Sequence, residues 1–507
     1  MKLFKLLSTS ILFSLAILLG CRKDDSFRTD SNTQLAFTVD TLHFDTVFTQ
    51  IGSATRFFKI KNNYSQSIKI SHLYLENNAN ATFRLNVDGI AGLDFKDLQI
   101  LPNDSLYVFA EVTVNPNAPI SDSPFVIDAN VVCVTNGTTQ RMVLEAFGQN
   151  ANYIPSRSSK GQLALLNAHG GTVIWDDKKP YVIYGVLFID STTLNIAPGT
   201  QIHVHGGLAR TQDSSKTFYN DGFIYLLSHA TINCMGTLAK PIVIQGDRLE
   251  KEFASDPGQW TGIVLGKGSK NNTVNYTTVK NAQLGIIVDS AADLTIKNSR
   301  LYNLNGNGLH GIHSKITAEN CLIYNTGSSC VKVDFGGQYN FSYCTFAFYS
   351  KDGYALDATN YYCYQLDASG NCAQDQGFVY TPTIINTTNS ILYGGKEDLI
   401  SLRNPALKTN PNIVFNFNFN NCLFRLKTIL DPTQASYYPN FLTNSPNSIQ
   451  VTSSDKIFKA PSLENYHPDS LSIAFKKAIP ISTIPTDIDG KPRDTNAPTI
   501  GCYETFK

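Results

Sequence analysis

The sequence has no excess of charge of either sign: 41 Lys and Arg residues stand against 41 Asp and Glu residues, and only 16% of the chain is charged. A neutral chain has no basic stripe to neutralise phosphates, so nucleic acid is excluded as an expected partner. The hydrophobic fraction of 42% is too high for a disordered chain. Only three Met and two Trp accompany 24 Tyr, 30 Phe and 34 Gly, which favours short strands and turns over packed helices. We expect an all-β protein.

The sequence also lacks the short motifs of several large enzyme classes. No phosphate-binding loop, nucleophile elbow or dense metal-binding motif occurs in its 507 residues. We therefore expect no nucleotide partner and no certain cofactor, although calcium is considered below. A chain of this length exceeds an ordinary single domain, so more than one domain is expected.

A short apolar run at the N-terminus follows two basic residues. Lys2 and Lys5 precede an uncharged stretch at residues 6–19, which is too short to span a bilayer and is typical of a signal-peptide core. The run ends in Leu-Leu-Gly-Cys at residues 18–21, which resembles the lipobox of bacterial lipoproteins. That resemblance implies a signal peptide at 1–20, acylation of Cys21 and attachment to a membrane. The alternative is an ordinary cleaved signal that has Cys at this position.

A charged cluster, Arg-Lys-Asp-Asp, follows at residues 22–25 in what we expect to be a tether over residues 21–34. The cluster resembles the signal that sends lipoproteins to the cell surface in Bacteroidetes-type bacteria. It implies an outer-membrane protein that is exposed on the cell surface. The alternative is a tether that is merely soluble.

Ten Cys are present, and acylation of Cys21 leaves nine, so at least one thiol is unpaired within the monomer. Cys363 and Cys372 lie in a stretch rich in Tyr and Asp that is typical of a loop. Because the cell envelope is oxidising, we predict a disulfide between them.

Residues 35–150 alternate between apolar and polar over short runs that are separated by Asn, Gly, Pro and Ser. This period of two is typical of the half-buried strands of a β-sandwich. The phrases FFKIKNNYSQSIKI and ILPNDSLYVFAEVTV resemble the immunoglobulin-like modules of the abnormal-spindle and hydin type. We interpret this domain as a spacer or adaptor, followed by a linker at residues 151–160.

Beyond residue 160 the sequence repeats. Asn298 and Asn320 begin phrases that match at five sites, each 22 positions apart. Such a unit holds three short strands and cannot bury its apolar side chains alone, whereas stacked units form a continuous core. We therefore predict a parallel β-helix over residues 161–507, with the Asn residues as a turn ladder along its axis. A column of small side chains should follow the Asn positions: Ser299, Cys321, Cys344, Ser390 and Cys422.

Several phrases resemble the pectate-lyase-like, right-handed parallel β-helix family: LNIAPGTQI at residues 194–202, GTLAKPIVIQG at 236–246 and WTGIVLG at 260–266. The tail at residues 486–504 resembles the closing motif of many surface-anchored bacterial β-helix proteins. The resemblance implies the fold over most of residues 160–505. The family contains lyases, hydrolases, esterases, adhesins and proteins of unassigned role, so it does not name a reaction.

Aligned strands of successive coils predict which side chains face outward. We expect five residues to point inward: Leu265, Val288, Ile312, Val333 and Leu356. The residue after each would then face solvent, which places Asp289, His313, Asp334 and Asp357 in one outer column, with Lys332 on the same face. These groups could share calcium, a proton or a ligand. His310 is expected to point inward as a satisfied core histidine, and His203 with His205 is too small a pair for a metal site.

Two catalytic interpretations of this column remain open. In a uronic-acid lyase, a cation would neutralise the substrate carboxylate while His313 or Lys332 removed the α-proton. In a hydrolase, Asp289 and Asp334, roughly 9.6 Å apart along the axis, could act as acid and base in the inverting arrangement. The structural alternative is that outward strand positions are polar in any soluble β-helix.

The segment at about 349–380 interrupts the repeat and is predicted to protrude. Long loops on a rigid scaffold usually carry function. Its Tyr rings have flat apolar faces with a polar edge, which suits sugar rings or a protein partner. The candidate binding residues are Tyr354, Tyr361, Tyr362 and Tyr364.

Three functions from different classes remain. The one that we favour is a surface-tethered protein whose β-helix binds or scaffolds polysaccharide. The second is a polysaccharide lyase or glycoside hydrolase that acts on acidic glycans. The third is an adhesin for a surface protein, or an assembly subunit.

Overall fold

The computed structural model describes residues 26–48, 53, 55–78, 81–114, 125–154, 163–210, 218–365, 378–404, 413–434, 436–469 and 471–505. The chain divides into two compact units, Met1–Asn150 and Ala151–Lys507. Both are all-β, as predicted; the described helical elements are two short 3-10 helices, Thr428–Leu430 and Pro461–Leu463. No helix among the described residues combines the length and the apolar character needed to cross a membrane.

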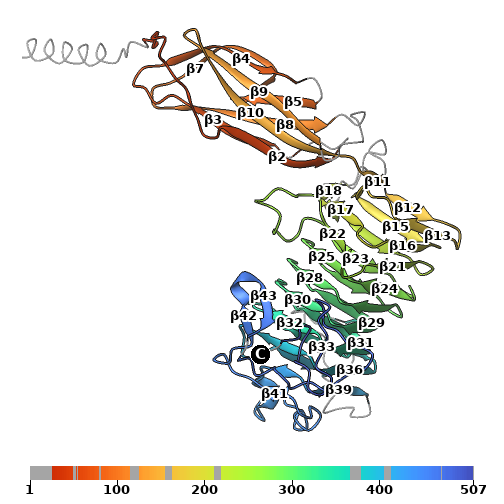
Figure 1. Ribbon diagram of the computed structural model, residues 1–507. Coiled ribbons are helices and arrows are strands. Elements are labelled where there is room, and N and C mark those ends of the chain that lie inside the picture. Colours follow the sequence, from red (N-terminus) through yellow and green to blue (C-terminus); the bar gives the residue numbers. More distant parts are fainter. Residues whose placement is uncertain are drawn as a thin grey trace, which may run out of the picture. The chain divides into compact units, whose positions relative to one another are not determined.

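The N-terminal unit is a β-sandwich of two five-stranded sheets (Figure 1). One sheet has the order β1 (Ala36–Phe37), β3 (Arg56–Lys61), β8 (Ser105–Val114), β5 (Ala81–Val87), β6 (Ile90–Gly92). The other has the order β2 (Thr41–Phe48), β10 (Thr138–Gln149), β9 (Phe125–Thr135), β4 (Ile68–Glu76), β7 (Asp94–Ile100). Alternate side chains of both sheets form one buried core, which is the period-two pattern of the sequence.

The β-sandwich includes residues before its predicted boundary at residue 35. Phe27 forms a bridge with Ser67, and the Arg28 amide donates to the Ser67 carbonyl at 2.8 Å. The second half of the expected tether at 21–34 therefore pairs with the sandwich, while Cys21 lies outside the described residues.

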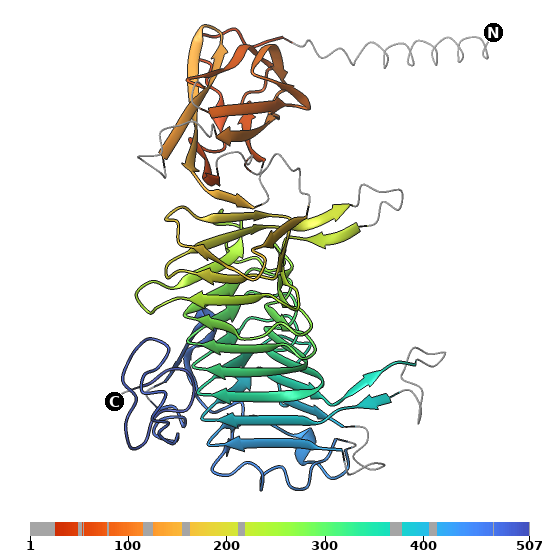
Figure 2. The same cartoon turned by 90° about the vertical axis from the view of Figure 1, so that its right-hand side faces the viewer.

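The second unit is a right-handed parallel β-helix with three strand faces (Figure 2). The first face consists of β12 (Ala164–Asn167), β15 (Val186–Asp190), β20 (Phe223–Leu226), β23 (Gly262–Leu265), β26 (Ile286–Val288), the first halves of β29 (Leu309–Glu319) and β31 (Val331–Ser342), β33 (Leu356–Thr359) and β38 (Ile400–Arg403). The second face consists of β13 (Thr172–Trp175), β16 (Thr193–Ile196), β21 (Thr231–Met235), β24 (Asn272–Asn275), β27 (Asp293–Lys297), the second halves of β29 and β31, β36 (Thr383–Thr388) and β39 (Phe415–Asn420).

The third face begins inside the predicted linker. It consists of β11 (Asn152–Ile154), β14 (Tyr181–Tyr184), β17 (Gln201–His205), β22 (Ile242–Gly246), β25 (Thr277–Lys280), β28 (Arg300–Tyr302), β30 (Leu322–Tyr324), β32 (Thr345–Phe348), β37 (Ile391–Gly394), β40 (Leu423–Phe424) and β41 (Ile449–Gln450). Because β11 pairs in parallel with β14, residues 152–154 of the linker at 151–160 are the first strand of this face.

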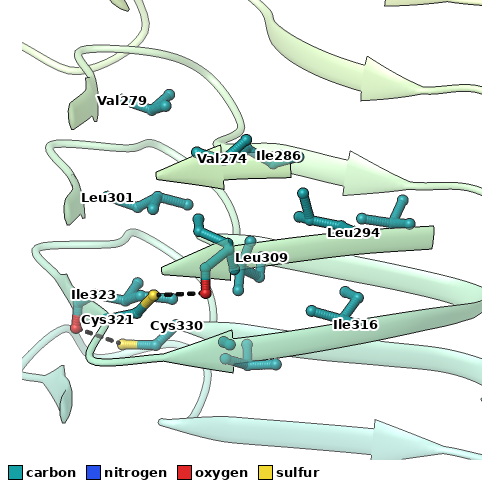
Figure 3. Packing of buried hydrophobic residues seen from close by; sticks show 14 of the residues in the cluster. Val274, Val279, Ile286, Leu294, Leu301, Leu309, Ile316, Cys321, Ile323 and Cys330 are labelled. Carbon is teal, nitrogen blue, oxygen red and sulfur yellow. Dashed lines mark hydrogen bonds between the residues drawn. The ribbon is translucent and has the colours of Figure 1, made fainter. Parts of the chain in front are cut away.

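The interior of the solenoid is a stack of aliphatic layers (Figure 3). The predicted column of Ser299, Cys321, Cys344, Ser390 and Cys422 is fully buried. The Cys321 thiol donates to the carbonyl of Ile296 at 3.5 Å, and the Cys330 thiol to that of Ile323 at 3.5 Å. Burial raises the pKa of Cys422 to about 12, so these thiols are structural rather than reactive.

The predicted Asn ladder is present at the corner between the second and third faces. The Asn320 amide donates to Asn298 Oδ1 at 3.0 Å, and the Asn298 amide to Asn275 Oδ1 at 3.1 Å. Asn298 and Asn320 adopt left-handed backbone φ values of 51° and 52°. Asn tolerates that conformation better than other residues with a side chain, which explains its recurrence every 22 positions.

The C-terminal segment folds back over the outer side of the third face instead of continuing the coils. It contributes the hairpin of β42 (Phe458–Ala460) and β43 (Asn465–Pro468) and a chain that ends in the buried residues Ile500, Cys502 and Tyr503. Its apolar side chains form a separate core with outward side chains of β30, β32 and β37, including Leu322, Tyr324 and Ile391.

Two hairpins interrupt the coils, and Figure 2 shows both projecting from the same flank of the solenoid. They are β18 (Gly207–Arg210) with β19 (Phe218–Asp221), and β34 (Tyr361–Cys363) with β35 (Phe378–Tyr380). The predicted insertion at 349–380 is therefore too long at its start. Its residues 356–359 are the solenoid strand β33, and the protruding part begins after Asn360.

Candidate functional site

The pairing register of the first face corrects the predicted outer column. Strand neighbours place Leu265, Val288, Gly311 and Val333 in one inward row, followed by Ala358. The predicted inward residue Ile312 instead pairs with Asp334 on the outer side. Because side chains alternate, one residue of slip moves a whole strand segment to the opposite side. The single column of Asp289, His313, Asp334 and Asp357 was therefore wrong.

Two adjacent outward rows replace that column. One row contains Ile287, His310, Lys332, Asp357 and Ser401, which are consecutive partners across five strands. The second row contains Ile312, Asp334, Thr359 and Arg403, two residues further along each strand. His310, predicted to be a core residue, thus faces outward. Asp289 lies at the end of β26, where its carboxylate accepts from the Ser290 amide at 2.6 Å and shapes a turn.

The two rows bring five charged or ionisable side chains into one chain of contacts, which we call the ion ladder: His310, Asp334, Lys332, Asp357 and Arg403. His310 Nε2 lies 2.8 Å from Asp334 Oδ2. Lys332 Nζ lies 3.6 Å from Asp334 Oδ1 and 3.1 Å from Asp357 Oδ2. Arg403 Nη2 donates to both oxygens of Asp357, at 3.1 and 3.0 Å. Four strands that are far apart in sequence therefore contribute to one alternating ladder of charges.

The ladder is buried at Asp357 and open at Arg403. The Asp357 side chain is 9% exposed, whereas that of Arg403 is 47% exposed. Burial alone would raise the pKa of Asp334, but the hydrogen bond from His310 and the charge of Lys332 outweigh burial, with help from the Thr359 hydroxyl at 3.2 Å. The pKa of Asp334 therefore lies below its ordinary value, and the carboxylate is ionised at neutral pH.

This arrangement limits the chemistry that the site can perform. A glycoside hydrolase needs one carboxyl group that holds its proton near neutral pH, and the pKa of Asp334 has moved in the other direction. Lys332 lies between the two carboxylates and forms ion pairs with both. The same lysine occupies the position between Asp334 and Asp357 where calcium would have to bind. Among the described residues, no group of three or more His, Cys, Asp or Glu side chains could hold a metal ion.

A row of three rings lies beside the ion ladder, and we call it the ring row: His313, Phe335 and Tyr362. His313 and Phe335 follow the ladder residues where β29 and β31 bend toward the second face, with left-handed φ values of 46° and 58°. The ring centroids of His313 and Phe335 are 5.3 Å apart, and those of Phe335 and Tyr362 are 5.8 Å apart. Tyr362 comes from the hairpin and is 58% exposed. The ring row thus joins the solenoid surface to the protruding hairpin.

His313 also borders a surface pocket of about 290 Å³ at the bend. Its Nδ1 lies 3.1 Å from the Phe335 carbonyl oxygen, a bond that holds the imidazole against the neighbouring coil. The pocket is lined further by Lys270, Lys315 and Gln338. His313, predicted to belong to the acidic column, is instead a member of the ring row that also lines this pocket.

The other predicted tyrosines have different surroundings. Tyr361 lies directly opposite Tyr380 in the hairpin, with centroids 6.5 Å apart. Tyr354 precedes β33, and Lys396 Nζ lies 4.6 Å from its ring centroid. Tyr364 is 57% exposed beyond the end of β34. The Tyr362 ring packs against Phe335 on the coil surface beside the ladder.

Cys363 in the same hairpin is disulfide-bonded. Its predicted partner Cys372 lies outside the described residues, so the pairing of the two stays a prediction. Seven other described cysteines are free and buried.

In the coils that precede the ion ladder in the chain, the outward rows of the first face are apolar and aromatic. Tyr225, Val264, Ile287 and His310 are successive neighbours across four strands. The rings of Phe188 and Tyr225 lie 5.6 Å apart, and Phe223 is within 6.3 Å of both. The first face therefore has aromatic groups in its early coils and the charged ladder with the ring row in its later coils.

The comparisons with known proteins agree with the solenoid. A family model described as "Right handed beta helix region" matches residues 261–425, which contain strands β23 to β40. No curated protein matches the chain.

Solved structures similar to this chain are remote. A GH87 α-1,3-glucanase catalytic unit from Streptomyces thermodiastaticus has 10% sequence identity and a TM-score of 0.27, with 73% of this chain and 67% of that chain covered. The pectate lyase Pel9A has 10% identity and a TM-score of 0.22, with 62% of this chain and 88% of that chain covered. A family 123 glycoside hydrolase from Clostridium perfringens has 9% identity and a TM-score of 0.18, with 45% and 63% covered.

Proposed function

We propose that this protein is a lipid-anchored, surface-exposed outer-membrane lipoprotein whose β-helix binds polysaccharide on its first face. The binding surface consists of the ion ladder and the ring row, with the hairpin β34–β35 as its edge. The anchor is the acylated Cys21, as the lipobox resemblance implies, and it would keep the solenoid at the membrane.

The observation that carries this proposal is the position of the ring row directly beside the ladder, since Phe335 follows Asp334 in the chain. Flat rings bind sugar faces through dispersion and apolar contact, while fixed charges bind hydroxyl groups through short hydrogen bonds. Asp334 and Phe335 are consecutive residues, so a sugar unit on the Phe335 and Tyr362 rings would lie next to the carboxylate of Asp334. The ladder residues hold one another in place, so little side-chain order is lost when a ligand binds.

The same contacts favour binding without turnover. Both ladder carboxylates are engaged with cations, and Asp334 holds no proton at neutral pH. Opposite charges alternate along the ladder, which suits a glycan that has hydroxyl groups or mixed charge better than one that is uniformly anionic.

A glycan array on the soluble chain that begins at Ser26 tests the proposal. We expect binding to at least one polysaccharide, without release of reducing ends or unsaturated products. The variant Tyr362→Ala should lose about tenfold in affinity, which corresponds to one stacked ring. Tyr349→Ala is the control, because Tyr349 is 43% exposed and its ring contacts Tyr466 in the C-terminal segment.

Three results would contradict the proposal: no glycan bound, equal loss in both variants, or turnover that disappears in Asp334→Asn. The last result would identify an enzyme at the same site. Capture of a surface protein from intact cells that competing glycans do not reduce would instead favour an adhesin.

Membrane attachment needs a separate test. The full chain should fractionate with membranes and be accessible to protease on whole cells, whereas Cys21→Ser should be released. Retention of the Cys21→Ser chain in the membrane fraction would contradict the lipid anchor.

A further inference from the structure

The sheet of the β-sandwich that contains β3 and β8 carries three exposed aromatic rings on its outer side. Phe57 is 53% exposed, and Tyr107 and Phe109 are each 38% exposed. Phe57 lies opposite Phe109 in the pairing of β3 with β8, and Tyr107 is two residues before Phe109 on the same side of β8. The ring centroids are all within 6.1 Å of one another. Contiguous exposed apolar groups of this kind mark an interaction surface, and we call the three rings the platform.

Two lysines of β3 border the platform. Lys59 is directly opposite Tyr107, and its ammonium nitrogen lies 4.3 Å from the centroid of that ring. Lys61 is exposed and points to the same side of the sheet, two residues after Lys59. The partner of the platform must therefore accept apolar rings and ammonium groups side by side.

The platform lies near the end of the sandwich at which the described chain begins. The Gln66 side-chain amide donates to Ser26 Oγ at 3.4 Å, and the Gln66 carbonyl accepts from the Asn62 side chain at 2.8 Å. Asn62 directly follows β3 and is three residues after Lys59. Since a strand rises roughly 3.3 Å per residue, Lys59 and its neighbour Tyr107 lie about 10 Å along the strands from this end.

Cys21 is close enough in sequence to hold this end of the sandwich at a membrane. It is five positions before Ser26, and five residues span at most about 17 Å. Phe27 and Leu101 at the same end are 39% and 50% exposed, and the Leu101 carbonyl accepts from the Asn62 side chain. A tether this short gives the sandwich an effective concentration at the bilayer of about millimolar, so a weakly binding surface is enough for contact.

We propose that the outer side of this sheet is a membrane-contact surface, which lies on the lipid bilayer to which Cys21 is attached. This inference rests on the lipid anchor of the proposed function and on none of the residues of the ion ladder or the ring row. The rings of Phe57 and Phe109 would enter the boundary between head groups and acyl chains.

The position of Lys59 fits a bilayer as the partner. At a membrane interface a lysine stem lies along apolar groups, while its ammonium stays among the head groups. Lys59 already has this arrangement beside the Tyr107 ring, so no rearrangement is needed for contact. The other charges on this side, Arg84 and Glu111, pair with each other at 3.5 Å, which limits the cost of bringing them to the surface of the bilayer.

The experiment uses the chain that begins at Cys21, coupled through the Cys21 thiol to a maleimide lipid in phosphatidylcholine vesicles. This coupling supplies the anchor whether or not cells acylate Cys21, so a failure of the platform is distinguishable from a failure of the lipid anchor. The seven free cysteines among the described residues are buried, which favours coupling at Cys21.

A Trp reporter in the platform measures contact with the bilayer. Tyr107→Trp places the reporter there, and Tyr74→Trp is the matched control on the outer side of the other sheet. The native Trp175 and Trp260 are 4% and 1% exposed in the core of the solenoid, so the wild type supplies their constant signal for subtraction. Vesicles with brominated acyl chains quench a Trp that enters the bilayer, and unbrominated vesicles are the reference.

We expect Tyr107→Trp to lose about half or more of its reporter emission in brominated vesicles, and Tyr74→Trp to lose less than about a tenth. Adding Phe57→Ser and Phe109→Ser to Tyr107→Trp should remove the quenching. Phe57→Leu with Phe109→Leu should retain it, which separates loss of membrane contact from loss of folding.

Equal quenching of the two reporters, or no quenching of Tyr107→Trp, would overturn the proposal. Self-association of the uncoupled chain that Phe57→Ser with Phe109→Ser abolishes, without quenching in vesicles, would assign the platform to a second copy of the chain instead. None of these results decides whether cells acylate Cys21, which the fractionation of Cys21→Ser tests.

Discussion

The first and third faces of the solenoid have the same inward pattern but different outward surfaces. On the third face, the outward positions of the later coils include Leu322, Tyr324 and Ala347, and residues of the C-terminal segment cover them. On the first face, the outward positions at the same level are His310, Lys332 and Asp357. The strands of the two faces therefore have similar inward-facing apolar side chains. They differ in their outward side chains, which the C-terminal segment covers on the third face.

The difference between the two faces shows which outward side chains form part of a buried core. An apolar outward row in a solenoid has to be covered, and here the chain itself supplies the cover. A row of paired charges needs no apolar cover, and the ladder on the first face remains open at Arg403. The first face is thus the surface available for a ligand, whereas the third face at these coils is part of a second core.

Two histidines at outward positions summarise the contrast. His203 on β17 of the third face is 5% exposed, and burial lowers its pKa to about 4. His310 on β29 of the first face has a carboxylate partner in Asp334 and a 16% exposed side chain. The same residue type is thus a buried neutral group on one face and a member of the ion ladder on the other.

The largest loss of stability is expected from a substitution that detaches the C-terminal segment from the third face. Arg493 lies in the C-terminal segment, forms a buried ion pair with Glu504 at 3.7 Å and donates to Asn320 Oδ1 at 2.8 Å. Its guanidinium also lies 3.7 Å from the Tyr343 ring centroid. Arg493→Ala leaves the Glu504 carboxylate buried without its partner, so we expect the solenoid to lose about 3–5 kcal/mol in urea denaturation.

Lys476→Ala is the matched control for Arg493. Its ion pair with Asp494 is 3.9 Å long and exposed, so the change should cost less than about 1 kcal/mol. Equal effects of the two substitutions would mean that the C-terminal segment does not stabilise the third face.

Acid should destabilise the folded protein, because His203 on the third face is buried as a neutral group. The pKa of His203 is about 4 in the fold and about 6.5 in the unfolded chain. The unfolded state therefore binds a proton at a higher pH than the folded state, and stability is lost as the pH falls from about 6.5 to 4. The loss attributable to His203 should be about 3 kcal/mol.

Urea denaturation of the wild type and of His203→Gln over this pH range measures that loss. The variant should show a flatter pH dependence than the wild type. His43→Gln, which removes an exposed histidine paired with Glu145 in the β-sandwich, is the matched control. A wild-type profile that stays flat from pH 6.5 to 4 would show that His203 is not buried as a neutral group.

A smaller effect is expected at the centre of the first face. Asp357→Asn removes the carboxylate that Lys332 and Arg403 share, and we expect a loss of about 1–3 kcal/mol. Glu397→Gln, at the exposed pair with Lys427, is the control and should be close to neutral. If Asp357→Asn stabilises the protein, the ladder is a strained ligand site instead of a structural element.

The smallest expected effect concerns Asp334. Its pKa is lowered in the fold, so its contribution to stability is present above the unfolded value of about 4 and is lost as the pH falls through the folded value. Because the side chain is 31% exposed, the contribution should be below about 1 kcal/mol. The stability difference between wild type and Asp334→Asn should shrink below pH 4; a difference that grows there would contradict the ladder.

The sequence predicted the coils well and the outward rows poorly, for a physical reason. Asn298 and Asn320 define a corner whose backbone needs a left-handed residue, and that requirement is visible as a fixed spacing of 22. The next corner also begins with left-handed Asn residues, Asn281 and Asn303, but the number of residues between that Asn and the following strand varies. Ile286 starts its strand five residues after Asn281, whereas Leu309 starts six after Asn303. One extra residue at a corner reverses the two sides of the following strand.

The ladder partners across insertions could not be found from the spacing. Arg403 lies 46 positions from Asp357 because the hairpin β34–β35 lies between their strands. Thr359 and Arg403 are neighbours on the adjacent strands β33 and β38. The sequence spacing does not reveal this pairing. Tyr362, in contrast, was accessible to sequence reasoning, because an insertion rich in Tyr on a regular scaffold is a local signal.

Hydrogen exchange with and without a bound oligosaccharide tests the contrast between the two faces most directly. We predict that the ligand protects peptides at residues 309–315, 331–337 and 356–364, while peptides at 320–326 and 343–349 keep their exchange rates. Protection of the third-face peptides without protection of the first-face peptides would contradict the account.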